Sequence, residues 1–248
     1  MIKLMKYELR KTMAVKMMVL GLTALAEIVF LIGLWGDRIH MLQAGIVILT
    51  MLAFGSLMVI GLASVVVLHR DVNTRQSYML FMTPNSCYKI MGAKMLENGL
   101  SIALAGACFF ALGALDVTLL FAKQNQLANL WEFIQNFLKN VSEELTFDLP
   151  TMLMLTLNLL GSWISSVTAM YLGVVISAAL LNGKRFNGLV SFLLIVAILW
   201  FIGWVQVIAT EHLGSIQTQF IVQAVIALAF SAVMYILASQ IMERKLSV

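Results

Sequence analysis

Six long apolar stretches constrain the fold of this chain more than any other feature of its sequence. They cover roughly residues 14–35, 45–68, 98–121, 152–181, 188–209 and 220–242 of 248. A helix crosses the hydrocarbon core of a bilayer in about 20 residues, and each stretch reaches that length. Hydrophobic residues make up 61% of the chain and charged residues only 11%, whereas a soluble domain has roughly a quarter charged residues. The sequence predicts an all-α, polytopic membrane protein with a single transmembrane domain over residues 1–248.

The positions of the basic residues predict how the six spans are oriented. Cytoplasmic segments of membrane proteins carry an excess of Lys and Arg. If the N-terminus is cytoplasmic, 13 of the 16 Lys and Arg residues fall on the cytoplasmic side, and Arg38, Lys123 and Lys139 fall outside. Both termini are therefore predicted to be cytoplasmic. This asymmetry accounts for the net charge of +4 without a nucleic acid as partner.

Two segments outside the spans have the apolar spacing of amphipathic helices. Residues 1–13 carry Lys and Arg on another face, which favours a helix in the inner headgroup layer over a simple charged flank. Residues 126–145 form the second segment, outside the membrane, and contain Trp131 and Phe137. The apolar face of this outer helix needs lipid, the bundle or a second subunit as cover. Amphipathicity alone does not decide between a surface helix that fills out a loop and an outer lid over an exit path.

The segment over residues 70–86 is predicted to be cytoplasmic, between the second and third spans. Asp71 is placed to cap a short helix there. Tyr78 and Phe81 give this helix an unusually apolar end for a loop, and Pro84 stops it. An apolar surface of this kind in the cytoplasm needs a cover, which is lipid, its own bundle or a partner protein.

The order of residues in this segment resembles the permeases of type-2 ABC transporters. The shared order is an acid, Thr, an apolar cluster, Thr-Pro with small polar residues, an apolar pair and Gly-x-Lys. In this chain the order is Asp71, Thr74, Tyr78 to Met82, Thr83, Pro84, Asn85, Ser86, Ile90, Met91, Gly92 and Lys94. Six spans, a short basic N-terminal helix and a cytoplasmic C-terminus are also similar to that family. The resemblance covers the whole chain in architecture and about 25 residues in sequence.

The resemblance implies that this segment is a coupling helix, which sits in a groove of a cytoplasmic ATPase subunit. The residues that it assigns to this interface are Asp71, Thr74, Arg75, Tyr78, Phe81 and Pro84. It also implies two permease and two ATPase subunits in a bacterial cell membrane. ATP and Mg²⁺ would be bound by the ATPase, with no cofactor in this chain. Compact family members resemble exporters of amphipathic peptides, such as phenol-soluble modulins and antimicrobial peptides, so the implied cargo is an amphipathic peptide or a lipid-like molecule.

The sequence has no motif for ATP hydrolysis. A phosphate-binding loop needs GxxxxGK[ST], and the one Gly-Lys pair, Gly183-Lys184, is followed by Arg185. An HExxH motif is also absent, so we expect neither enzymatic activity nor a metal site in this chain, and ATPase activity in a partner. The loop over residues 210–218 is short, which departs from larger family members with re-entrant helices at this point.

Glu27 lies near the middle of the first span, where a carboxylate is costly unless it is neutral, paired or wetted. Its candidate partners in other spans are Asn158, Ser165, Gln206 and Gln223, whereas Asp116 lies nearer an interface and has less weight. These polar residues either hold helices together or belong to a translocation path, and the sequence leaves both open. One rival function is an ion-coupled secondary transporter that uses Glu27 as a proton site. Another is a non-transporting membrane scaffold or immunity protein.

Overall fold

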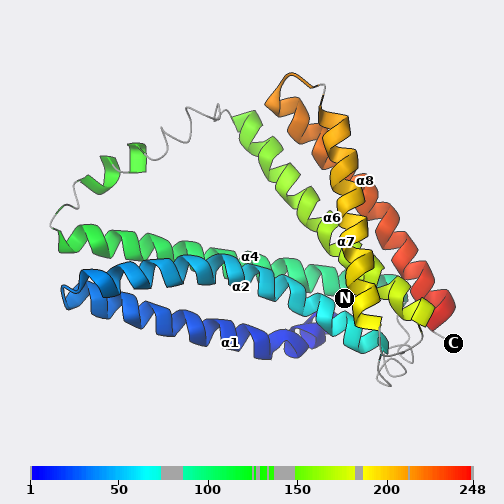
Figure 1. The fold of residues 1–248 in the computed structure, drawn as a ribbon, viewed down its shortest axis with the longest axis horizontal. Helices are drawn as coiled ribbons and strands as arrows, with labels where there is room; N and C mark the ends of the chain where they lie inside the picture. The colour runs from blue at the N-terminus through cyan, green and yellow to red at the C-terminus, as the bar shows by residue number, and fades with distance from the viewer. Residues whose placement is uncertain are drawn as a thin grey trace. The chain divides into compact units, whose positions relative to one another are not determined.

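The chain forms six long α-helices. The computed structural model describes residues 2–73, 86–124, 126, 129–132, 134–136, 149–181, 187–211 and 213–246. The helices are α1 (Ile2–Trp35), α2 (Ile39–Asn73), α4 (Cys87–Lys123), α6 (Leu149–Leu181), α7 (Asn187–Thr210) and α8 (Ile216–Ile241), and a π-helical turn, η1 (Met242–Leu246), follows α8 (Figure 1). All six are long and apolar enough to cross a membrane, and the described residues contain no strand. The predicted all-α class, with six helices long and apolar enough to be spans, is therefore confirmed.

Four of the helices are much longer than the hydrocarbon core of a bilayer is thick. Helices α1, α2, α4 and α6 have 34, 35, 37 and 33 residues. At about 1.5 Å per residue each is roughly 50–55 Å long, whereas the hydrocarbon core measures about 30 Å. Part of each helix must therefore stand in the headgroup layer or in water.

The N-terminal segment is continuous with the first span. Residues predicted as a separate interfacial helix over 1–13 form, from Ile2 onwards, the first turns of α1. Glu8 and Thr12 are buried in these turns, while Lys6 and Arg10 are exposed. The segment contains no Gly or Pro that would interrupt the helix. Its place in the headgroup layer stays a prediction.

The chain folds into two compact units. Unit 1 contains Met1–Leu9, Ala63–Glu97 and Asp148–Val248, and unit 2 contains Arg10–Leu62 and Asn98–Phe147. The boundaries fall inside α1, α2 and α4, so each of these helices contributes to both units. The prediction of a single transmembrane domain stays a prediction.

Helix α6 is the centre of unit 1, where α7 and α8 pack against it. In the apolar 18-residue stretch of α6, 61% of the residues are buried, which is a larger share than in the corresponding stretch of any other described helix. Tyr171 is fully buried, and its hydroxyl lies 2.6 Å from the Ser64 hydroxyl on α2. Small residues bring α6 and α8 close together, since a Cβ added at Gly161 would lie 3.3 Å from the carbonyl oxygen of Ala224.

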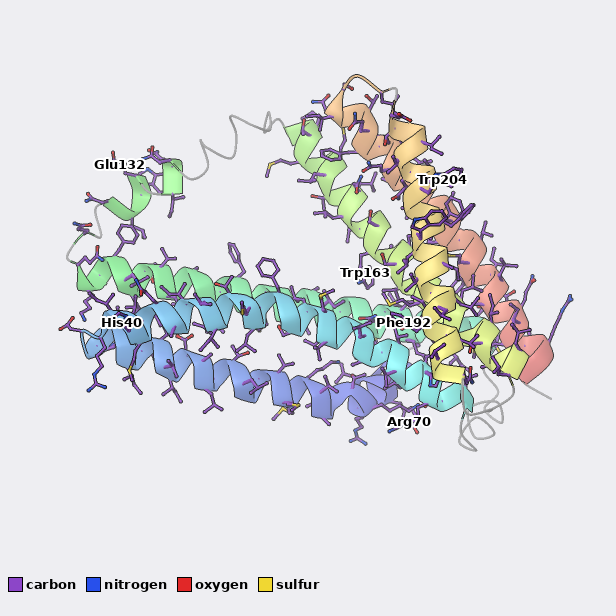
Figure 2. The ribbon with its side chains drawn as sticks, viewed as in Figure 1. His40, Arg70, Glu132, Trp163, Phe192 and Trp204 are labelled. Carbon is purple, nitrogen blue, oxygen red and sulfur yellow. The ribbon has the colours of Figure 1, made fainter. Side chains whose placement is uncertain are left out.

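The outer surface of α7 is apolar. Phe192, Trp200 and Trp204 on this helix are all more than half exposed. Figure 2 labels Phe192 and Trp204. A soluble protein rarely exposes so many large apolar side chains on one helix. Contact with lipid is the environment that this surface fits.

In unit 2, α1 and α2 form a tight hairpin. A Cβ added at Gly45 would lie 2.7 Å from the Cα atom of Phe30, so only glycine fits between the two backbones. Asp37 in the turn has a φ of 52°, a region that Asp tolerates better than most residues. The ammonium group of Lys123 on α4 donates hydrogen bonds to the Leu34 carbonyl and to the Asp37 carboxylate. A cation at the C-terminus of α1 also interacts favourably with the helix dipole.

Replacing Gly45 by Ala tests the close contact between α1 and α2. We expect Gly45→Ala to lower the free energy of unfolding by about 1–3 kcal/mol, because the added methyl group meets backbone that must shift. Gly55→Ala on the same helix is the matched control, since nothing lies within 4 Å of its added Cβ. We expect this control to retain or raise stability, because Ala favours a helix by about 1 kcal/mol over Gly. Thermal unfolding in detergent micelles measures both, and equal midpoints would contradict the packing described here.

Candidate functional site

A buried lysine joins three helices in unit 1. The ammonium nitrogen of Lys94, on α4, lies 2.6 Å from Glu8 Oε2 on α1 and 2.7 Å from Asp71 Oδ2 on α2. The exposed fraction of the Lys94 side chain is 1%, and those of Glu8 and Asp71 are 6% and 4%. We call these three residues the Lys94 triad. In Figure 1 the beginning of α1, the end of α2 and the beginning of α4 lie together at this point.

The pairing explains why a lysine can be buried here. Removing an ammonium or a carboxylate from water is expensive, and close opposite charges with good hydrogen bonds offset that cost. An ammonium group has three donors, of which Lys94 uses one for each carboxylate of the triad. Glu8 and Asp71 each have a further interaction besides the one with Lys94. The triad is therefore a fixed point at which three helices meet.

The Lys94 triad lies at the base of the predicted coupling segment. Helix α2 ends at Asn73 and α4 begins at Cys87, so Asp71 and Lys94 stand on the helices that enter and leave the segment between them. Arg70, next to Asp71, is labelled in Figure 2. The triad therefore connects both ends of this segment to the first turns of α1.

Most of the residues predicted to contact the ATPase subunit lie outside the described residues. The coupling-helix candidates Thr74, Arg75, Tyr78, Phe81 and Pro84 lie outside the described residues. The sixth candidate is described: Asp71 is buried and bound to Lys94, so the structure gives its carboxylate a partner within the chain. Its place at an interface with another protein stays a prediction.

Glu27 has a partner on α4. Its carboxyl group lies beside that of Asp116, and both residues are half-buried in unit 2. One oxygen of each group, Glu27 Oε2 and Asp116 Oδ1, is buried without a hydrogen-bond partner among the described residues. Asp116, which had less weight in the sequence analysis, is the residue that meets Glu27.

Polar contacts join α1 and α4 at several levels. In unit 2, Lys16 donates to the Ser101 hydroxyl at 2.6 Å, and the pairs Glu27 with Asp116 and Leu34 with Lys123 follow toward the other end. The partners are 85 to 89 residues apart in the sequence, and Glu8 and Lys94 in unit 1 are 86 apart. A nearly constant separation means that α1 and α4 run parallel in a fixed register.

Three of the residues predicted as partners of Glu27 come together in unit 1. Asn158 Nδ2 on α6 donates to Gln223 Oε1 on α8 at 2.9 Å and to the Phe220 carbonyl at 3.2 Å. Gln206 Nε2 on α7 lies 3.5 Å from the Gln223 carbonyl. Asn158, Gln206 and Gln223 form the amide cluster, which links three helices. Hydrogen bonds of this kind hold helices together in membranes, and a role in translocation stays a prediction.

Only a part of the predicted outer helix is described. Helical residues occur at 129–132 and 134–136, and Phe137 lies outside the described residues. Trp131 is exposed over two thirds of its surface, and the neighbouring Glu132 is labelled in Figure 2. Its role as a lid stays a prediction.

The long apolar helices, with polar side chains paired between them, define an all-helical, multi-pass membrane protein. Comparison of the chain with protein-family models, curated proteins and solved structures finds no match. Within the part of the chain that the structure describes, no three His, Cys, Asp or Glu side chains gather where they could hold a metal ion. Any functional proposal therefore depends on the residues described above and on the resemblance of residues 70–96.

The charges of the Lys94 triad predict a ranking of substitutions. Lys94→Met leaves two carboxylates buried beside each other, so we expect a loss of about 3–5 kcal/mol in the free energy of unfolding. Glu8→Gln leaves a neutral pair of Lys94 and Asp71, and we expect a loss of about 1–3 kcal/mol. Unfolding midpoints in detergent micelles measure this order.

Lys89→Met is the matched control, because Lys89 lies on the same helix and is exposed. Exposed substitutions usually change stability by about 0.5 kcal/mol or less. If Lys94→Met unfolded at the midpoint of Lys89→Met, the triad would not stabilise the junction of α1, α2 and α4.

Proposed function

We propose that this chain is the membrane-spanning permease subunit of an ATP-driven ABC exporter. The observation that carries the proposal is the Lys94 triad. A buried ammonium group ties both helices that flank residues 74–85 to the N-terminal turns of α1. A fixed base of this kind suits a segment that receives force from a partner. The segment also contains the residues that resemble the coupling helix of type-2 ABC permeases.

In this proposal a separate cytoplasmic subunit binds ATP and Mg²⁺ and hydrolyses the nucleotide. Closure of two such ATPases presses on residues 74–85 of two permease subunits. Helices α2 and α4 have 35 and 37 residues without a break, and both pass from unit 1 into unit 2. A displacement at the ends of these helices is therefore carried along them into the membrane. The chain acts in a bacterial cell membrane, with both termini in the cytoplasm.

The proposed cargo is an amphipathic peptide or a lipid-like molecule. The spans offer large apolar surfaces, including Leu104 and Phe110 on α4, which are more than half exposed. The amide cluster adds donors and acceptors of the kind that peptide groups bind. Such a combination suits a molecule with one apolar and one polar face.

Binding of the ATPase tests the proposal. We expect a cytoplasmic ATPase to co-purify with the wild-type chain from membranes of the source cell. Tyr78→Asp and Phe81→Asp should each weaken this binding at least about tenfold, because an unpaired carboxylate buried in an apolar groove costs more than about 1.4 kcal/mol. Affinity capture followed by an ATPase assay of the eluate measures the association.

Trp131→Asp is the control for the two coupling-segment variants, since Trp131 is exposed on a segment predicted to lie outside the membrane. It should capture as much ATPase as the wild type. The proposal fails if the wild type captures no ATPase, or if Tyr78→Asp and Phe81→Asp capture it as well as Trp131→Asp does.

One observation favours a second candidate, an ion-coupled secondary transporter. The carboxyl groups of Glu27 and Asp116 lie beside each other inside the membrane-spanning part of the chain, where two carboxylates are costly unless a proton is bound. In this candidate the pair takes up and releases a proton as cargo moves, without an ATPase partner.

Glu27→Gln separates the two candidates. We expect liposomes that contain the wild-type chain to show no proton uptake above the lipid background when a pH gradient is applied. Glu27→Gln should leave ATP-driven activity of the complex unchanged, because Gln has nearly the shape of Glu and its amide can donate a hydrogen bond to Asp116. A pH-sensitive dye inside the liposomes measures proton uptake, with Glu132→Gln as an exposed control. Wild-type uptake that Glu27→Gln abolishes would favour the secondary transporter.

A further inference from the structure

We propose that Lys94 is a positioning residue that makes the first turns of α1 move together with the two ends of residues 74–85. We call this connection of Glu8 and Asp71 through Lys94 the tie. Its use in transport rests on the proposed function, whereas its existence does not. In the exporter, pressure on the segment would reach α1 through Lys94 as well as α2 and α4 through the backbone.

The division of the chain supports this inference. Met1–Leu9 belongs to unit 1, together with Ala63–Glu97, whereas α1 from Arg10 onwards belongs to unit 2. The boundary inside α1 falls two residues after Glu8, the residue that binds Lys94. The first turns of α1 are thus part of the same compact body as the end of α2 and the beginning of α4.

The chemistry of the triad indicates that it sets position more than stability. Well-packed apolar side chains often stabilise a junction as well as a buried ion pair does, and an ion pair is weak evidence for stability. Two short bonds from one nitrogen, at 2.6 and 2.7 Å, instead fix where each carboxylate stands. Because the carboxylates come from α1 and α2, the ammonium group on α4 holds three helix ends in one arrangement.

One substitution releases α1 and leaves the rest of the triad paired. Glu8→Met removes the α1 carboxylate with little change in side-chain length. Lys94 and Asp71 then remain as a neutral pair that still joins α2 to α4. Lys6→Met is the matched control, because Lys6 lies in the same turns of α1 and is exposed.

Hydrogen–deuterium exchange of the purified chain tests the tie without any partner. We expect amides of residues 2–9 to exchange faster in Glu8→Met than in the wild type and in Lys6→Met. Exchange in α6 and α8 should be the same in all three proteins. If residues 2–9 of Glu8→Met exchanged at the wild-type rate, the tie through Lys94 would be refuted.

A second experiment tests the use of the tie in the complex with the ATPase. The chain carries Cys87→Ala and Cys108→Ser, and a fluorescent label is attached at Tyr7→Cys, in the first turns of α1, where the side chain is exposed. We expect ATP to change the label's emission in this background and with Lys6→Met. With Glu8→Met the emission change should be lost while ATP hydrolysis continues.

A retained emission change in Glu8→Met would overturn the inference, since α1 would then follow the ATPase without Glu8. If Glu8→Met acted only by unfolding the chain, ATPase binding and hydrolysis would be lost together with the emission change, and this result would also overturn the inference. Failure of the proposed function looks different, because the wild type would then bind no ATPase, and the exchange experiment would decide on the tie alone.

Discussion

The ammonium group of Lys94 is the interaction on which the arrangement of unit 1 depends. It is almost completely buried, and it meets carboxylates from two other helices within 2.7 Å. In such surroundings a charge must keep its partners, because the alternative is an unpaired ion out of reach of water. The beginning of α1, the end of α2 and the beginning of α4 are therefore held at one point. The apolar core around Leu68, Met91 and Tyr171 packs beside this junction and anchors it to α6.

The same requirement shapes the rest of the spans. Lys16 contacts Ser101, Glu27 contacts Asp116, and Asn158 contacts Gln223. Each of these contacts joins two different helices. A bilayer supplies no water to satisfy such groups, so polar side chains at these depths find partners on neighbouring helices. Apolar side chains do not select partners in this way, since lipid and protein offer them similar surroundings. A small number of polar residues thus specifies which helices pair and in which register.

The helices could be predicted from the sequence, but the pairs between them could not. Hydropathy is a local property, so six spans followed directly from the composition of each stretch. The separate helix predicted over residues 1–13 was drawn from its amphipathic spacing, whereas α1 continues through residue 13 as one helix. The contacts of Lys94 and Glu27 depend on how helices some 86 to 89 residues apart are rotated and aligned. For this reason polar residues of other spans were proposed as partners of Glu27, and Asp116 received less weight.

The parallel register of α1 and α4 has a consequence for the lengths of these helices. Each residue advances an α-helix by about 100° of rotation, from 3.6 residues per turn. Deleting one residue between Lys16 and Glu27 would turn every later side chain of α1 away from its partner on α4. Glu27 would no longer face Asp116, and Leu34 would no longer meet Lys123. Many of the apolar residues in this stretch are interchangeable, but their number is not.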